Sequence, residues 1–73
     1  MNAQTLINQA TAAGFESYGS FNEGGLQHEI LTATEGAYDG EVVDIYYDYH
    51  TGAVDSFEVS SQFKDQQPLF KFN

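Results

Sequence analysis

The chain of 73 residues contains no cysteine, no tryptophan and no arginine, and Pro68 is its single proline. Without cysteine it can form neither a disulfide nor a thiolate metal site, so apolar packing or a partner must stabilise the fold. No apolar run approaches the roughly 20 residues that a membrane-spanning helix requires. The first residues also lack the basic and apolar segments of a secretory signal. We therefore expect a cytoplasmic protein that makes no membrane contact.

Positive charge is almost as scarce as cysteine. Eleven acidic residues stand against Lys64 and Lys71, which gives a net charge of −9. Proteins that bind DNA or RNA directly use Lys and Arg to displace counterions from phosphates, so this composition argues against direct nucleic-acid binding. An anionic membrane surface is disfavoured for the same reason. The partner that this charge favours is a protein with a basic surface.

The N-terminal segment has the spacing of an amphipathic helix over about residues 3–13. Its apolar stripe consists of Leu6, Ile7, Ala10 and Ala13. Asn2 is a candidate N-cap, and Gly14 suits the position after the helix, where positive φ is common. Phe15 follows directly and is expected to fold back on the last turn. A helix this short is marginal alone in water, so we expect it to pack on a sheet.

After residue 15 the hydrophobic period changes from helical to two, as in strands. The predicted strands cover about 15–22, 26–34, 41–49 and 53–60, and 69–72 is either a short fifth strand or a docked tail. Gly24-Gly25 and Gly52 suit the tight turns between them. The predicted fold class is α+β: a single domain over 1–73, with one helix packed on a four- or five-stranded antiparallel meander. The pattern leaves open which face of 26–34 is buried.

The strongest alternation lies in segment 41–60, which predicts a β-hairpin with two different faces. In its first arm, one face carries Val43, Ile45 and Tyr47, and the other face carries Val42, Asp44, Tyr46 and Asp48. In the second arm, Ala53, Phe57 and Val59 lie on the apolar face, and Val54, Ser56 and Glu58 lie on the other face. Asp55 falls on the apolar side, near the turn. One face of the hairpin is therefore expected to be buried and the other to be acidic and tyrosine-bearing.

Catalytic residues do not form a recognisable arrangement. There is no cysteine nucleophile, and neither His28 nor His50 stands in a Ser/His/Asp context, so we predict that the protein is not an enzyme. His50 is expected in solvent at a turn, and His28 as a packed or cross-strand partner. No glycine-rich phosphate loop is present either. We predict that the protein uses no cofactor.

The carboxylates between residues 39 and 44 suit a hard cation in composition but not in spacing. Asp39, Glu41 and Asp44 do not follow the EF-hand pattern, and the last two would point to opposite faces of a strand. We therefore predict no metal site. Asp44 and Asp48 would lie about 13 Å apart along a strand. The carboxyl pairs of glycoside hydrolases are closer, at about 5 to 9.5 Å.

The remaining interpretation of these acids is a binding surface. The candidate partner-binding residues are Asp39, Glu41, Asp44, Tyr46, Asp48 and Glu58, with Asp39 and Glu41 at the rim of the acidic face. Carboxylates held on a rigid sheet can take the place of phosphates in a basic groove, and tyrosine is enriched at interfaces. The alternative is a solvated face whose acids only keep the protein soluble.

The profile as a whole resembles small acidic inhibitors encoded by phages. This group includes anti-CRISPR, antirestriction and uracil-DNA glycosylase inhibitor proteins, several of which mimic DNA. The residues that carry the resemblance are Asp39, Glu41, Asp44 and Asp48. It implies a stoichiometric inhibitor in the cytoplasm of a host bacterium, which blocks the basic nucleic-acid-binding site of a defence complex.

A second resemblance is local. Residues 48–54, with the sequence DYHTGAV, are similar to the D-x-x-T-G-x-V hairpin of PepSY domains. This resemblance implies a small structural or regulatory module that binds a peptide or a protein, in which the acidity is incidental. Members of that family usually carry a secretory signal, which this chain lacks. Either function is compatible with a homodimer formed through an exposed edge such as 70–72.

Overall fold

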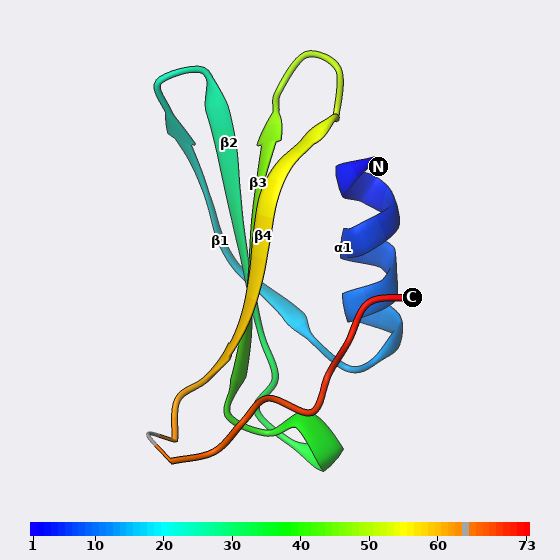
Figure 1. Ribbon diagram of the computed structural model, residues 1–73, viewed down its shortest axis with the longest axis vertical. Helices are drawn as coiled ribbons and strands as arrows, with labels where there is room; N and C mark the ends of the chain where they lie inside the picture. The colour runs from blue at the N-terminus through cyan, green and yellow to red at the C-terminus, as the bar shows by residue number, and fades with distance from the viewer. Residues whose placement is uncertain (64) are drawn as a thin grey trace.

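The computed structural model describes residues 1–63 and 65–73, and its elements follow one another in a simple order. They are α1 (Ala3–Ala12), β1 (Glu16–Glu23), β2 (Leu26–Thr32), the 3₁₀ helix η1 (Gly36–Tyr38), β3 (Glu41–Asp48) and β4 (Val54–Ser61). The strands form one antiparallel sheet in the order β1-β2-β3-β4, and α1 covers one side of it (Figure 1). The predicted α+β architecture is confirmed, with four strands. Neither helix in the described part of the chain has the length and hydropathy of a membrane span.

Both ends of α1 are closed by the residues that the sequence indicates. The Asn2 side chain accepts a hydrogen bond from the Gln4 amide at 2.8 Å, as an N-cap does. At the other end Gly14 has a φ of 104°, and the Phe15 amide donates to the Ala10 carbonyl at 3.0 Å. This is the bonding of a Schellman motif. It turns Phe15 back under the helix, where only 1% of it is exposed, so the predicted fold-back is confirmed.

The first hairpin depends on two glycines. Gly24 and Gly25 have φ values of 61° and 93°, a region that residues with a Cβ rarely adopt, and they join Glu23 directly to its partner Leu26. A two-residue turn fixes the register of the strands on either side. The alignment of β1 with β2 near the turn is therefore determined by local sequence.

The second hairpin contains a β-bulge that alternation alone does not predict. The register pairs Tyr46 with Ser56 but Tyr47 with Val54, so Asp55 is an extra residue in β4. The bulge moves Val54 to the α1 side, where it packs against the core. The prediction that Val54 shares a face with Ser56 and Glu58 is therefore wrong. Asp55 breaks the expected pattern because it is the bulged residue, and it is exposed.

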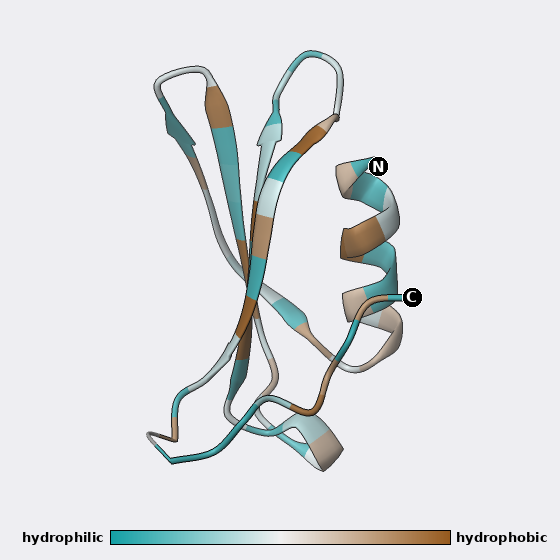
Figure 2. Cartoon of the chain, in the orientation of Figure 1, coloured by the Kyte–Doolittle hydropathy of each residue, from teal (hydrophilic) through white to brown (hydrophobic). Residues whose placement is uncertain are grey.

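The core lies between α1 and the sheet. It consists of Ala3, Leu6, Ala10, Phe15, Leu31, Ala33, Val43, Ile45 and Phe70. Val43 and Ile45 of β3 are 0% exposed, as the sequence predicts for the apolar face of that strand. Leu31 pairs with Val43, so the side of β2 that carries Leu31 is the buried one. Figure 2 shows hydrophobic segments in the middle of the strands, in α1 and in the C-terminal tail, whereas the two hairpin loops at the top are hydrophilic or neutral.

The C-terminal segment is a docked tail, and the possible fifth strand at 69–72 is not formed. It returns past η1 and ends beside α1 (Figure 1), where the Asn73 amide donates to Gln9 Oε1 at 2.9 Å. Phe70 is 6% exposed, and its ring centre lies 4.9 Å from that of Phe15 and 5.4 Å from that of Tyr38. Residues 70–72 therefore offer no exposed strand for a dimer of the predicted kind.

Candidate protein-interaction face

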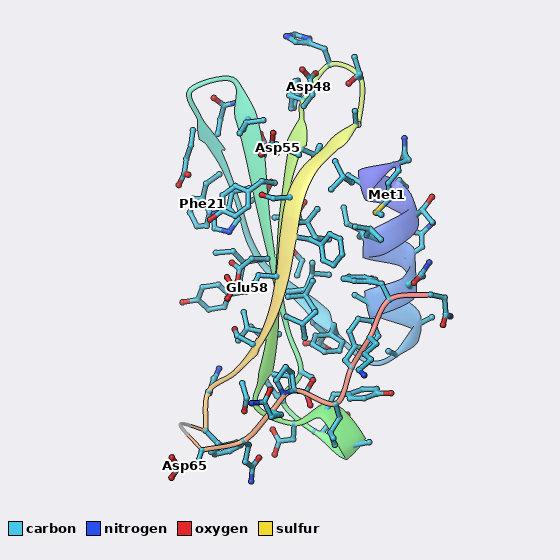
Figure 3. The ribbon with its side chains drawn as sticks, viewed as in Figure 1. Met1, Phe21, Asp48, Asp55, Glu58 and Asp65 are labelled. Carbon is cyan, nitrogen blue, oxygen red and sulfur yellow. The ribbon has the colours of Figure 1, made fainter. Side chains whose placement is uncertain are left out.

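The side of the sheet opposite α1 is the open face, and no helix or tail lies over it in Figure 1. Paired residues share a face, so the register gives its main members. They are Phe21 and Glu23 of β1, Leu26, His28 and Ile30 of β2, Val42, Asp44, Tyr46 and Asp48 of β3, and Ser56, Glu58 and Ser60 of β4. Figure 3 shows Phe21 and Glu58 on the side of the sheet away from α1.

Charge on this face has one sign. Both lysines of the chain, Lys64 and Lys71, come after β4 in the sequence, so no strand contains a basic residue other than histidine. Asp44 and Glu58 are directly paired across β3 and β4. Like charges opposite one another destabilise a sheet, whereas a lysine at position 58 would form a favourable pair with Asp44. The open face thus keeps a charge arrangement that is unfavourable for folding alone.

His28 lies at the centre of the face and holds Asp44 and Tyr46 in place. Its Nε2 atom is 2.7 Å from Asp44 Oδ1, and its Nδ1 atom is 4.0 Å from Glu23 Oε1. The imidazole stacks on the Tyr46 ring, with centres 4.1 Å apart and planes 16° apart. Phe21 lies at the side, at 6.4 Å. The prediction that His28 is a cross-strand partner is confirmed.

Tyr46 carries a neutral phenol in this environment. Partial burial against its neighbours raises the pKa of Tyr46 above its usual value, and the negative charges of Asp44, Glu23 and Glu58 raise it further. The hydroxyl therefore stays protonated under physiological conditions and can donate a hydrogen bond. A tyrosine flanked by fixed carboxylates offers a partner an aromatic surface, a donor and acceptors within one small area.

The predicted site residues fall into two groups. Asp44, Tyr46 and Glu58 are neighbours in the middle of the open face. Asp48 shares that face at the end of β3, but its Oδ1 accepts hydrogen bonds from the amides of His50 at 2.8 Å and Thr51 at 3.0 Å. These backbone hydrogen bonds, that from Thr51 first, lower the pKa of Asp48. Asp48 therefore shapes the turn.

Asp39 and Glu41 lie away from this centre. Asp39 is exposed in the turn after η1, at the opposite end of β3 from Asp48. Glu41 is 4% exposed, so its predicted position at an exposed rim is wrong. Its carboxylate accepts hydrogen bonds from the amides of Leu69 at 2.9 Å and Phe70 at 3.0 Å. These two hydrogen bonds give an acceptor to the buried Phe70 amide and to the partly buried Leu69 amide, and they offset the cost of burying the carboxylate.

The cluster around His28 contains three residues that were not among the predicted site residues, namely Phe21, Glu23 and His28 itself. The Gly24-Gly25 turn was the available signal, because it places Phe21 opposite His28. The pairing of His28 with Tyr46 across β2 and β3 depends on the loop over residues 33–40, whose length and conformation the sequence pattern does not fix. Within the described residues, no three His, Asp or Glu side chains gather closely enough to hold a metal ion.

The DYHTGAV segment is explained by the geometry of its turn. The Asp48 carboxylate accepts from two turn amides, Thr51 Oγ1 accepts from the Ala53 amide at 3.2 Å, and Gly52 has a φ of 77°. Asp48, Thr51 and Gly52 of the motif thus each have a local structural role in the turn. Comparison of the chain with protein-family models, curated proteins and solved structures gives no match. The fold and the open face define a small α+β protein with one acidic, aromatic sheet surface.

Proposed function

We propose that this protein is a stoichiometric inhibitor that docks its open face on the basic, nucleic-acid-binding surface of another protein. One observation carries the proposal: Asp44 and Glu58 face each other beside Tyr46, on a sheet whose strands contain no lysine or arginine. The pair is unfavourable in the free protein, and a partner's cations would neutralise it. If the face served only to keep the protein soluble, a mixture of acids and lysines would stabilise the sheet better than acids alone.

The face is also built to bind with little rearrangement. Its acids and rings project from paired strands, and the contacts of His28 with Asp44 and Tyr46 restrict the rotamers of both. Side chains that are already ordered lose less entropy when a complex forms. Because exposed charges are screened beyond about 8 Å at physiological ionic strength, binding should weaken as salt rises.

The test is capture and inhibition with two matched double variants. The face variant combines Tyr46→Ala with Glu58→Lys. The control combines Tyr49→Ala with Asp65→Lys, which makes the same change of composition and charge at exposed positions outside the open face. Each immobilised protein is incubated with a nuclease-treated bacterial lysate, and each captured protein is assayed for nucleic-acid binding as the inhibitor is titrated. Circular dichroism confirms that both variants are folded.

The wild type and the control should capture the same nucleic-acid-binding protein and abolish its nucleic-acid binding at a one-to-one ratio. The face variant should do neither. If the two variants lose binding equally, total charge and not the open face attracts the partner. If the wild type captures no protein that binds nucleic acid, the proposed function is wrong.

A further inference from the structure

The edge of the sheet at β4 borders a groove of about 440 Å³. Three consecutive β4 residues, Phe57, Glu58 and Val59, line it together with Phe70, Lys71 and Phe72 of the tail. Consecutive residues of a strand point to opposite faces, so a groove that touches all three must reach the backbone edge of β4. Its walls are mostly apolar, and the rings of Phe57 and Phe72 meet at 5.2 Å between centres.

Among the described residues, the backbone along this edge has partners only at its beginning, where the N-terminus covers it. The Val54 amide donates to the Met1 carbonyl at 3.1 Å, and the Ala3 amide donates to the Gly52 carbonyl at 2.8 Å. From Asp55 to Ser61, no described residue beyond β3 makes a backbone hydrogen bond to β4. In Figure 1, β4 crosses in front of the other strands, and no other segment is drawn over its middle. An extended chain can therefore pair there.

The side chains on the two faces of β4 indicate which residue types such a chain must contain. On the groove side, Phe57 is 43% exposed despite its contact with the tail, so an apolar side chain can cover it. On the open face, Glu58 is exposed and paired with Asp44, so the neighbouring position suits a basic side chain. An added strand continues the alternation of the sheet. We infer that the β4 edge binds an extended segment of a partner protein in which apolar and basic residues alternate.

A second copy of this chain does not fit the same edge. Antiparallel pairing of two β4 strands would bring together strands that each carry Asp55 and Glu58 and no cation. The chain has one apolar-basic-apolar sequence with alternate aromatic rings, Phe70-Lys71-Phe72, and it already forms the opposite wall of the groove. The segment must therefore come from another protein. This site adjoins the open face and shares Glu58 with it, whereas Phe57 and the tail residues belong to the groove alone.

The probe is a synthetic peptide with blocked ends, in which four lysines alternate with three phenylalanines. Its control has the same composition, with the three phenylalanines placed in one block. Binding is measured from the backbone amide shifts of the full chain. The alternating peptide should bind about tenfold more tightly or better and shift the amides of residues 55–61 and 67–72. Phe57→Ser should weaken it by a similar factor, whereas Tyr18→Ser at the exposed β1 edge should not change it.

Three results would overturn the inference. Equal affinity for the two peptides would mean that charge alone attracts them. Equal effects of Phe57→Ser and Tyr18→Ser, in spectra that show both variants folded, would mean that the groove is not the site. If sedimentation without peptide shows a dimer, and the same amide signals shift as the protein concentration rises, the edge binds a second copy of this chain.

Discussion

The two faces of β3 differ in both burial and charge. Val43 and Ile45 are completely buried under α1, while Asp44 and Tyr46, one residue away in each case, lie half-buried on the open face. The same strand therefore supplies the centre of the core and the centre of the proposed binding surface. The comparison teaches that stability and recognition can be separated by the alternation of side chains, and that variants on the two faces should have different effects.

The largest expected effect is that of Ile45→Ala on the buried face. Replacing a completely buried isoleucine by alanine lowers the free energy of unfolding by about 2 to 5 kcal/mol, because apolar burial is lost and a cavity remains. In a domain of this size each 1 kcal/mol lowers Tm by about 4 to 8 °C. Urea and thermal unfolding measure the loss. Val42→Ala, on the open face of the same strand, is the control, and an equal loss in both variants would remove the distinction between the faces.

The next effect concerns Glu41, the one buried acid among the described residues. Glu41→Ala removes the acceptor of the Leu69 and Phe70 amides, at a cost of about 1 to 3 kcal/mol for the Phe70 amide, which is left buried without a partner, and less for the partly buried Leu69 amide. The tail should detach, and hydrogen exchange of both amides should accelerate. Glu41→Gln, which keeps an acceptor oxygen, should have a smaller effect. Unchanged exchange in Glu41→Ala would show that the tail is held by Phe70 alone.

A smaller effect should depend on pH at the end of β3. Hydrogen bonds from Thr51 and His50 lower the pKa of Asp48 in the folded state. Its contribution to stability is therefore present above its unfolded pKa of about 3.9 and is lost as pH falls through the lower folded value. Asp48→Ala should have a lower Tm than the wild type at pH 7, and the difference should shrink below about pH 4. A difference that stays constant down to pH 2, or one that Asp55→Ala reproduces, would contradict this role.

The smallest effect on stability is expected for Tyr46→Phe on the open face. The ring keeps its stacking on His28, so Tm should stay within a few degrees of the wild type. Loss of the donor should weaken partner binding about threefold to tenfold, which titration calorimetry with the captured partner can measure. Unchanged affinity would mean that the tyrosine hydroxyl does not contact the partner.

Local sequence determined much of this structure. The caps of α1, the fold-back of Phe15, the Gly24-Gly25 turn and the two faces of β3 follow from short-range patterns, and all are present. The grouping of Asp44 with Tyr46 follows from the same alternation.

The features that were not predicted depend on contacts between distant residues. The bulge at Asp55 moves Val54 to the other face of the sheet. The burial of Glu41 depends on its contact with the tail, 28 residues away in the sequence. The approach of His28 to Asp44 needs the register of β2 on β3, which a pattern within one strand cannot supply. Alternation identified the acidic face correctly at its centre and did not predict these three features.

The most direct test of the separation between the faces is the single variant Glu58→Lys, measured for Tm and for inhibition of the partner in the same buffer. The lysine would lie opposite Asp44, so the account predicts a cross-strand ion pair and a Tm equal to or slightly above that of the wild type. It also predicts that inhibition is lost. A fall in Tm together with unchanged inhibition would contradict the claim that this face trades stability for recognition.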